Sequence, residues 1–105
     1  MKKQMFYPPL RNEFTKFGDK FVKIAHNEAN GMYCYKRTTS EGLIYYEVFK
    51  APQAKGEDGS IYERYPKSSE FGFGTALCIR GNEKCAADKI AFYMANGFEA
   101  GRYRA

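Results

Sequence analysis

The stretch "LIYYEVFKA", residues 43–51, decides the fold class, because it is the clearest β-strand in the chain. It is rich in β-branched and aromatic residues, and Glu47 and Lys50 are its only charges. Successive residues of a strand point to opposite faces, so this stretch carries apolar side chains on both sides. We therefore expect a central strand that is covered by a helix on one side.

The segment just before it, residues 20–39, indicates a β-hairpin with its turn at Asn30-Gly31. Asn-Gly is the preferred pair for a two-residue type I′ turn, because both positions need a positive φ. In that register Ala29 lies opposite Met32. One face of the hairpin, which we expect to line the core, then carries Val22, Ile24, His26, Tyr33 and Tyr35. The other face carries Lys23, Asn27, Cys34 and Lys36.

The segment after it contains short strands and one helix. Residues 52–60 combine proline, glycine and charges and indicate an exposed loop, while "IYERY" (61–65) and "TALCI" (75–79) indicate strands. A helix is predicted over 82–96, with Asn82 as N-cap, Glu83 in the first turn and Gly97 as the stop. Its apolar residues recur at helical spacing and are Ala86, Ile90, Tyr93 and Met94.

The order of these elements predicts an α+β fold. We expect an antiparallel four- to five-stranded β-meander with one C-terminal helix (about 82–96) packed on one face. The 105 residues suffice for one domain with one core. Residues 1–18 contain two prolines and are interpreted as an N-terminal arm or edge segment, 19–97 as the single domain, and 98–105 as a basic, loosely held C-terminal tail.

The glycines of "FGFGT" do not indicate a phosphate-binding loop. Gly72 and Gly74 begin like a dinucleotide fingerprint, but the third glycine position is Leu77, and a strand follows where a helix is needed. A P-loop would need a lysine that is absent here. We interpret the two glycines as a sharp chain reversal before the strand at 75–79.

The cysteines do not form a recognisable metal or catalytic pattern. Cys78 and Cys85 are separated by six residues, and the predicted hairpin puts His26 and Cys34 on opposite faces, so the spacing does not suit zinc. Cys85 near a helix N-terminus could be activated, but the only histidine is distant in sequence. We expect Cys78 and Cys85 to be buried, all cysteines to be reduced, and the protein to be non-enzymatic, without metal or cofactor.

Charge and aromatic content point toward binding. The net charge is +5, and nine Tyr and nine Phe interleave with the basic residues. Such a surface suits an acidic protein patch or a nucleic-acid backbone. The predicted helix carries only Lys84 and Lys89, so it is a poor reader of the DNA major groove. The first residues lack the apolar run of a signal peptide, and no stretch is long enough to span a membrane, so we expect a cytoplasmic protein.

Four segments together resemble a known group of proteins. They are "YYEVFKAP" (45–52), "YPKSSEFG" (65–72), "TALCI" (75–79) and the alanine-containing "EKCAADKIAFY" (83–93). Their order resembles small uncharacterised proteins encoded by phages and other mobile elements, over about residues 43–94. Residues 1–38 and the extra "FG" before Thr75 depart from that pattern. The resemblance implies a small stand-alone protein acting in a host cytoplasm, and it transfers no catalytic residue.

The expected function is that of a non-enzymatic interaction protein. Its partner would be a host protein or nucleoprotein complex, and one form would be a stoichiometric inhibitor of a nucleic-acid-handling or defence complex, as anti-CRISPR proteins are. The alternative is a basic accessory protein that binds DNA or RNA directly. No membrane partner is expected, and the oligomeric state is left open. The predicted partner-binding residues lie on the sheet face away from the helix, or at the sheet edge with the N-terminal arm, and are Phe6, Tyr7, Arg11, Lys23 and Lys36.

Overall fold

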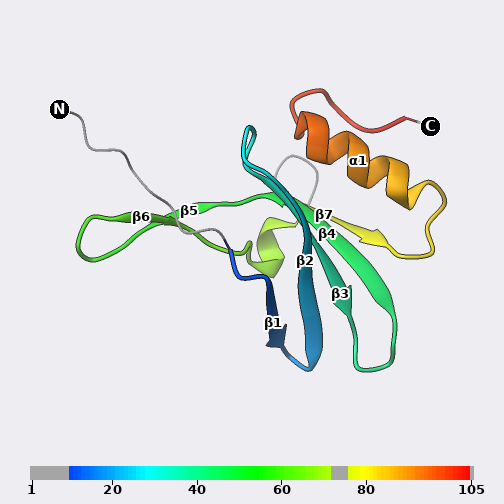
Figure 1. The fold of residues 1–105 in the computed structure, drawn as a ribbon, viewed down its shortest axis with the longest axis horizontal. Coiled ribbons are helices and arrows are strands. Elements are labelled where there is room, and N and C mark those ends of the chain that lie inside the picture. Colours follow the sequence, from blue (N-terminus) through cyan, green and yellow to red (C-terminus); the bar gives the residue numbers. More distant parts are fainter. Residues whose placement is uncertain (1–9, 72–75, 105) are drawn as a thin grey trace.

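The computed structural model describes residues 10–71 and 76–104, and it has the α+β architecture that the sequence predicts (Figure 1). Its main sheet is antiparallel throughout, with the strand order β1-β2-β3-β4-β7. These strands are β1 (Glu13–Lys16), β2 (Asp19–Asn27), β3 (Met32–Thr38), β4 (Ile44–Lys50) and β7 (Ala76–Arg80). The helix α1 (Ala86–Asn96) lies across one face.

A small excursion separates β4 from β7 along the chain. The strands β5 (Gln53–Lys55) and β6 (Ile61–Glu63) form their own antiparallel pair, and a short 3-10 helix, η1 (Ser68–Glu70), follows. The loop predicted over 52–60 is therefore wrong for Gln53–Lys55, and the strand predicted over 61–65 ends at Glu63. The chain reversal predicted at Gly72 and Gly74 lies outside the described residues.

The strand β4 confirms the interpretation of residues 43–51. It lies between β3 and β7, and two of its adjacent side chains, Val48 and Phe49, are fully buried on opposite faces. Each face has its own core. The helix core contains Met32, Cys34, Val48, Ile79 and Tyr93. The aromatic core contains Phe21, Tyr33, Tyr35, Phe49, Ala51 and Ala76, with Leu10, Phe14, Tyr65 and Phe71 packed against it.

The predicted register of the β2–β3 hairpin is wrong. Asn27 pairs with Met32, so residues 28–31 form a longer connection, and a bulge interrupts β2 between Lys23 and Ala25. The reason is tertiary: the side-chain amides of Asn27 and Asn30 donate hydrogen bonds to the carbonyl of Met94, at 2.9 and 3.0 Å. These bonds satisfy the end of α1, which a two-residue Asn-Gly turn would not do.

The new register separates two lysines that were expected to share a face. Lys23 pairs with Tyr35 and lies on the side of the aromatic core. Lys36 lies two residues beyond Cys34 on β3 and therefore points to the helix side. A single surface cannot present both side chains.

The helix begins later than predicted and ends where predicted. Its first residue is Ala86 rather than residue 82, because the amide of Gly81 still bonds the carbonyl of Ile44 at 2.8 Å and extends the sheet. Residues 81–85 then turn the chain, and Cys85 takes a left-handed φ of 63° before the helix. At the other end Gly97, with φ 65°, donates to the carbonyl of Tyr93 and stops the helix.

The C-terminal tail packs back on the helix and is not loosely held. The amide of Tyr103 donates to the hydroxyl of Tyr93 at 2.8 Å, and its ring meets Phe92 edge to face, with 5.7 Å between centroids. Phe98 also packs against the helix core. Phe98 and Tyr103 therefore hold residues 98–103 against α1.

Candidate functional site

The tip of the β1–β2 hairpin carries the most exposed large apolar side chain of the described residues. Phe17 and Gly18 connect the paired residues Lys16 and Asp19, and both have positive φ angles, 55° and 82°. Positive φ at both central positions is the signature of a type I′ turn, which favours asparagine and glycine. Phe17 is 90% exposed, and the Nζ of Lys16 lies 5.5 Å from its ring centroid.

This tip combines backbone strain with an exposed ring. A left-handed conformation costs a side-chain-bearing residue about 1–2 kcal/mol. Burial of the Phe17 ring within the fold does not offset that conformational cost, because the ring is almost entirely in solvent. Strained positions and exposed aromatic groups both concentrate at functional sites.

A hollow of about 310 Å³ adjoins Phe17 on the aromatic side of the sheet. Its lining combines aromatic, basic and acidic groups and consists of Lys16, Phe17, Phe21, Arg37, Glu47, Tyr65, Pro66, Phe71 and Cys78. The residues come from β1, β2, β3, β4, β7 and the segment after β6. The hollow is thus built by segments that are distant in sequence.

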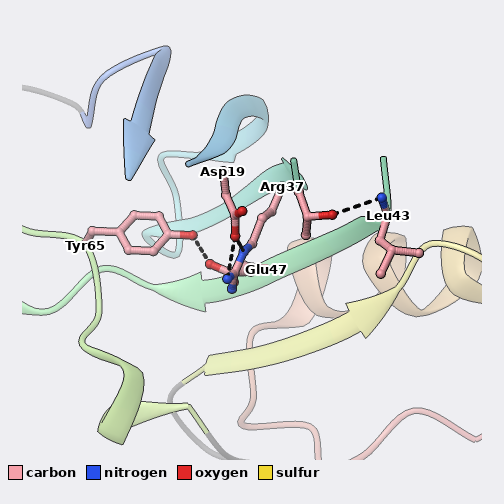
Figure 2. A network of polar contacts seen from close by, with 6 residues as sticks. Asp19, Arg37, Leu43, Glu47 and Tyr65 are labelled. Atoms are coloured by element: carbon pink, nitrogen blue, oxygen red, sulfur yellow. Dashed lines mark hydrogen bonds and ion pairs between the residues drawn. The ribbon is translucent and has the colours of Figure 1, made fainter. Parts of the chain in front are cut away.

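A set of four polar residues, called here the Arg37 network, contributes to this hollow (Figure 2). The guanidinium of Arg37 donates to Asp19 through Nε at 2.7 Å and to Glu47 through Nη1 at 3.0 Å. The Tyr65 hydroxyl points at Glu47 and donates to its other carboxylate oxygen. Asp19 and Glu47 are both buried, so each carboxylate needs these donors.

Figure 2 also shows a contact outside this network: the amide of Leu43 donates to the Thr39 side chain and closes the β3–β4 turn.

Two side chains of the hollow, Cys78 and Tyr65, have raised pKa values. Burial, followed by the nearby Glu47 charge, raises the pKa of both the Cys78 thiol and the Tyr65 hydroxyl. A raised pKa keeps these groups protonated and weakly nucleophilic at neutral pH. The two carboxylates are held by Arg37 and are therefore engaged in structure.

Other segments of the chain cover the sheet face opposite the helix. Less of this face is therefore exposed to a partner than the sequence predicted. The Tyr33 hydroxyl donates to Glu63 at 2.5 Å and accepts from the amide of Leu10 at 3.3 Å. Burial and then the Glu63 hydrogen bond raise the pKa of Tyr33 to about 12. The Tyr35 hydroxyl donates to the carbonyl of Arg11. Residues 10–11 and 63–71 therefore pack over Tyr33 and Tyr35, which the sequence predicted to line the core.

Of the five predicted partner-binding residues, the structure describes Arg11, Lys23 and Lys36, and these three do not share one face of the sheet. Phe6 and Tyr7 lie outside the described residues. Arg11 is exposed, and the Nζ of Lys23 donates to the adjacent Leu10 carbonyl at 2.9 Å while lying 5.6 Å from the Tyr33 ring centroid. The structure thus brings Arg11 near Lys23 and places Lys36 on the other side of the sheet. Their role in binding stays a prediction.

Sequence reasoning missed Phe17 and the Arg37 network. Phe17 was hidden because residues 1–18 were interpreted as an arm, although "EFTK" and "DKFVK" flank a Phe-Gly pair as hairpin strands do. One feature of the sequence could have predicted the Arg37 network. Glu47 is an acid inside the most apolar strand, and a buried acid requires a partner.

The cysteines and His26 show no arrangement for metal binding or disulfide formation within residues 10–71 and 76–104. Cys34 is buried, whereas Cys85 is half-buried and Cys78 is exposed, both contrary to expectation. The exposure of Cys78 is partial, because its side chain lines the hollow beside Glu47. His26 stacks on Tyr33 with 3.9 Å between centroids. In the same part of the chain, α1 and every other helix are too short or too polar to cross a bilayer.

No protein-family model matches the chain, and no curated protein or solved structure matches it significantly. Its function is therefore inferred from the site itself.

Proposed function

We propose that the protein is a non-enzymatic interaction module and that Phe17 anchors its partner. The observation that carries this proposal is an aromatic ring held 90% exposed on a strained turn. Burying a phenylalanine ring contributes about 1.5–3 kcal/mol, which exceeds the conformational cost of the turn. Aromatic residues are common anchors at protein interfaces. Burial of Phe17 by a partner therefore offsets the conformational cost of the turn.

The charges near the tip favour an acidic partner surface. Lys16 precedes Phe17 and Lys20 follows it closely, and both are exposed. The acid of the same hairpin end, Asp19, is buried and paired with Arg37. The tip therefore presents a ring between basic groups, which suits an apolar pocket with an acidic rim.

The expected context supports a host protein or nucleoprotein complex as that partner. Small proteins of phages and mobile elements, which this sequence resembles, act on host components in the cytoplasm. Blocking a nucleic-acid-handling or defence complex needs occupancy of a surface and no catalytic group. A stoichiometric inhibitor is thus the specific form of the proposal.

Direct binding of single-stranded nucleic acid is the second candidate, and the same tip favours it. An exposed aromatic ring can stack on a base while flanking lysines contact phosphates. The two candidates differ in salt dependence, because log affinity for single strands falls with log salt concentration by about 0.7 per phosphate contact. A protein interface anchored by Phe17 should weaken much less with salt.

The test uses Phe17→Asn in affinity capture from bacterial lysate, with and without nuclease, followed by titration of the captured partner. Asparagine suits the positive φ, so the variant should be more stable by roughly 0.5–1 kcal/mol. It should also bind at least about tenfold more weakly, since an anchor contributes more than 1 kcal/mol. This combination of gained stability and lost binding is not expected from a purely structural role.

Leu43→Ser is the matched control, because Leu43 is also exposed in a turn. It should leave binding to the captured partner unchanged. Equal binding by the wild type and Phe17→Asn would reject the anchor. Nuclease-sensitive capture with a steep salt dependence would instead establish the nucleic-acid alternative.

A further inference from the structure

The outer edge of β1 is open to solvent within the part of the chain that the structure describes. β1 is the first strand of the main sheet, and no described strand pairs with its outer side (Figure 1). Residues 11–13 and 15–16 are exposed along this edge, and Phe14 between them is half-buried. The unpaired N–H and C=O groups of such an edge are a template for another strand.

Glu13 and Thr15 carry the outward backbone groups of β1. The amide of Lys23 donates to the carbonyl of Asn12 at 2.7 Å, so Asn12 faces β2. In an antiparallel pair the residues that bond the neighbouring strand alternate along the chain. Phe14 therefore also bonds β2, and the N–H and C=O groups of Glu13 and Thr15 point away from it. Each of these two residues offers one donor and one acceptor to an added strand.

A hollow of about 330 Å³ lies beside this edge on the aromatic side of the sheet. Its apolar lining includes the half-buried side chains Leu10, Phe14 and Tyr65, and the exposed Arg11 and Lys16 also line it. Phe14 packs on the aromatic core, and the residue opposite it in an added strand points to the same face. That position of an added strand is therefore placed at the hollow and suits an apolar side chain.

The charges along the edge favour an acidic segment. Arg11, Lys16 and Lys20 are exposed here, and Glu13 is the one acidic side chain of β1. An acidic residue directly opposite Lys16 in an added strand forms a cross-strand pair of opposite charge. Complementary charge of this kind selects one partner over another and fixes its register.

We propose that an extended acidic segment of the partner protein adds to β1 as an antiparallel strand. From its N-terminal end, the segment has an acidic residue opposite Lys16, an apolar residue opposite Phe14 at the hollow, and a polar residue opposite Asn12. Backbone hydrogen bonds hold such a strand, and the contacts of alternate side chains give it specificity. The proposal rests on the interaction function proposed above and specifies how the partner binds beside Phe17.

The probe is the capped peptide Asp-Thr-Leu-Thr-Gln-Glu, whose residues lie opposite Lys16 through Arg11 in this register. Titration into the isotope-labelled full chain, followed by amide resonances, should show saturable binding. We expect a dissociation constant on the order of 0.1–1 mM, because a short segment buries far less than the roughly 1,600 Å² of a standard interface. The amide resonances of Glu13 and Thr15 should move downfield as their N–H groups gain acceptors.

N-methylation of the peptide tests the backbone hydrogen bonds. Methyl groups on both threonine nitrogens remove the N–H groups that face β1 and should weaken binding at least about tenfold. The matched control carries one methyl group on the leucine nitrogen, which faces away from β1, and should bind like the unmodified peptide. Exchanging the leucine with the first threonine moves the apolar side chain to the helix side and should weaken binding several-fold.

Charge reversal tests the register. Lys16→Glu should bind the peptide several-fold more weakly, and a peptide with lysine in place of its aspartate should restore binding to this variant. Lys84→Glu is the matched control, because Lys84 is also exposed but lies in the turn before α1. It should bind both peptides like the wild type.

Phe17→Asn separates strand addition from the anchor, because the peptide ends opposite Lys16 and does not extend to Phe17. This variant should bind the peptide like the wild type, whatever its effect on capture of the whole partner. No shift of the Glu13 and Thr15 amides at about 2 mM peptide, above the expected dissociation constant, would overturn strand addition without touching the anchor. So would equal binding of the two N-methylated forms, or the same shifts on concentrating the protein alone, which would place a second copy at this edge.

Discussion

At the scale of single residues, Arg37 is the cation on which two buried acidic side chains depend. One guanidinium forms ion pairs with two buried carboxylates, Asp19 and Glu47, while its own side chain stays 35% exposed. It also lies over the Phe21 ring, 5.4 Å from the centroid. Buried ion pairs contribute little net stability, but removing one partner leaves a charge without compensation. Arg37 is therefore the residue whose loss the network tolerates least.

Replacing Arg37 with methionine should destabilise the fold by about 3 kcal/mol at pH 7. This is the lower end of the usual 3–5 kcal/mol, because the side chain is partly exposed. Urea unfolding at pH 7 measures this loss of stability. Lys36→Met, the neighbouring cation on the same strand, should change stability by less than about 0.5 kcal/mol. Equal losses in the two variants would contradict this role for Arg37.

Glu70 gives a second residue-scale prediction, which concerns pH. Its carboxylate accepts two hydrogen bonds from Arg64, each 2.8 Å, and a third from the Lys67 amide. These contacts, Arg64 first, lower the pKa of Glu70 from 4.5 to about 2. A depressed folded-state pKa means that the stabilisation is present above pH 4.5 and is lost as the pH falls toward 2.

Glu70→Gln should therefore be less stable than the wild type at neutral pH and indistinguishable from it near pH 2. Denaturant melts across this interval measure the difference. Glu57→Gln, an exposed change in the β5–β6 turn, serves as control and should follow the wild-type profile. A constant difference at all pH values would show that the Arg64 contact is not responsible.

At the scale of elements, the β2–β3 loop acts as a cap for the helix. The amide groups of Asn27 and Asn30 meet the carbonyl of Met94, and Oδ1 of Asn27 accepts from the amide of Ala29 at 3.0 Å. The last carbonyls of a helix lack partners within the helix. A loop from the sheet supplies these partners and fixes α1 against β2 and β3.

Asn27→Asp should be more harmful than Asn27→Ala. Alanine removes one hydrogen bond and should cost about 1 kcal/mol. Aspartate keeps the Oδ1 acceptor but places negative charge at the negative end of the helix dipole, so about 2 kcal/mol is expected. Asn96→Ala, whose amide bonds Phe92 on the exposed helix surface, is the control and should cost less than about 0.5 kcal/mol. The opposite order for aspartate and alanine, measured by urea unfolding, would reject the capping role.

The same cap explains what the sequence could and could not predict. The strand at 43–51 and the helix stop at Gly97 depend on local patterns, so both were predictable. The turn at Asn30-Gly31 was not, because the asparagine satisfies the helix end in preference to its local turn type. The helix start depends on Gly81 pairing with Ile44, another contact between distant segments. The hollow near Phe17 combines six such segments, which no short pattern reveals.

At the scale of the whole molecule, one sheet separates two cores. Alternate residues of β3 serve different cores: Met32 and Cys34 face the helix, and Tyr33 and Tyr35 face the aromatic side. Side chains of β4 alternate in the same way, with Val48 and Phe49 fully buried. Disturbing either core must therefore disturb strands on which the other depends. This predicts one cooperative unit rather than two independently melting layers.

Two core variants test this cooperativity, one on each side of the sheet. Ile79→Val in the helix core should cost about 0.5–1.5 kcal/mol, and Phe49→Leu in the aromatic core about 1–2 kcal/mol. The chain has no tryptophan, so the near-ultraviolet signal comes mainly from its nine tyrosines, while far-ultraviolet dichroism reports the helix. In each variant both signals should shift to the same new midpoint in urea, with an unchanged slope. A Phe49→Leu protein whose tyrosine signal melts before its helix would show instead that the two cores unfold separately.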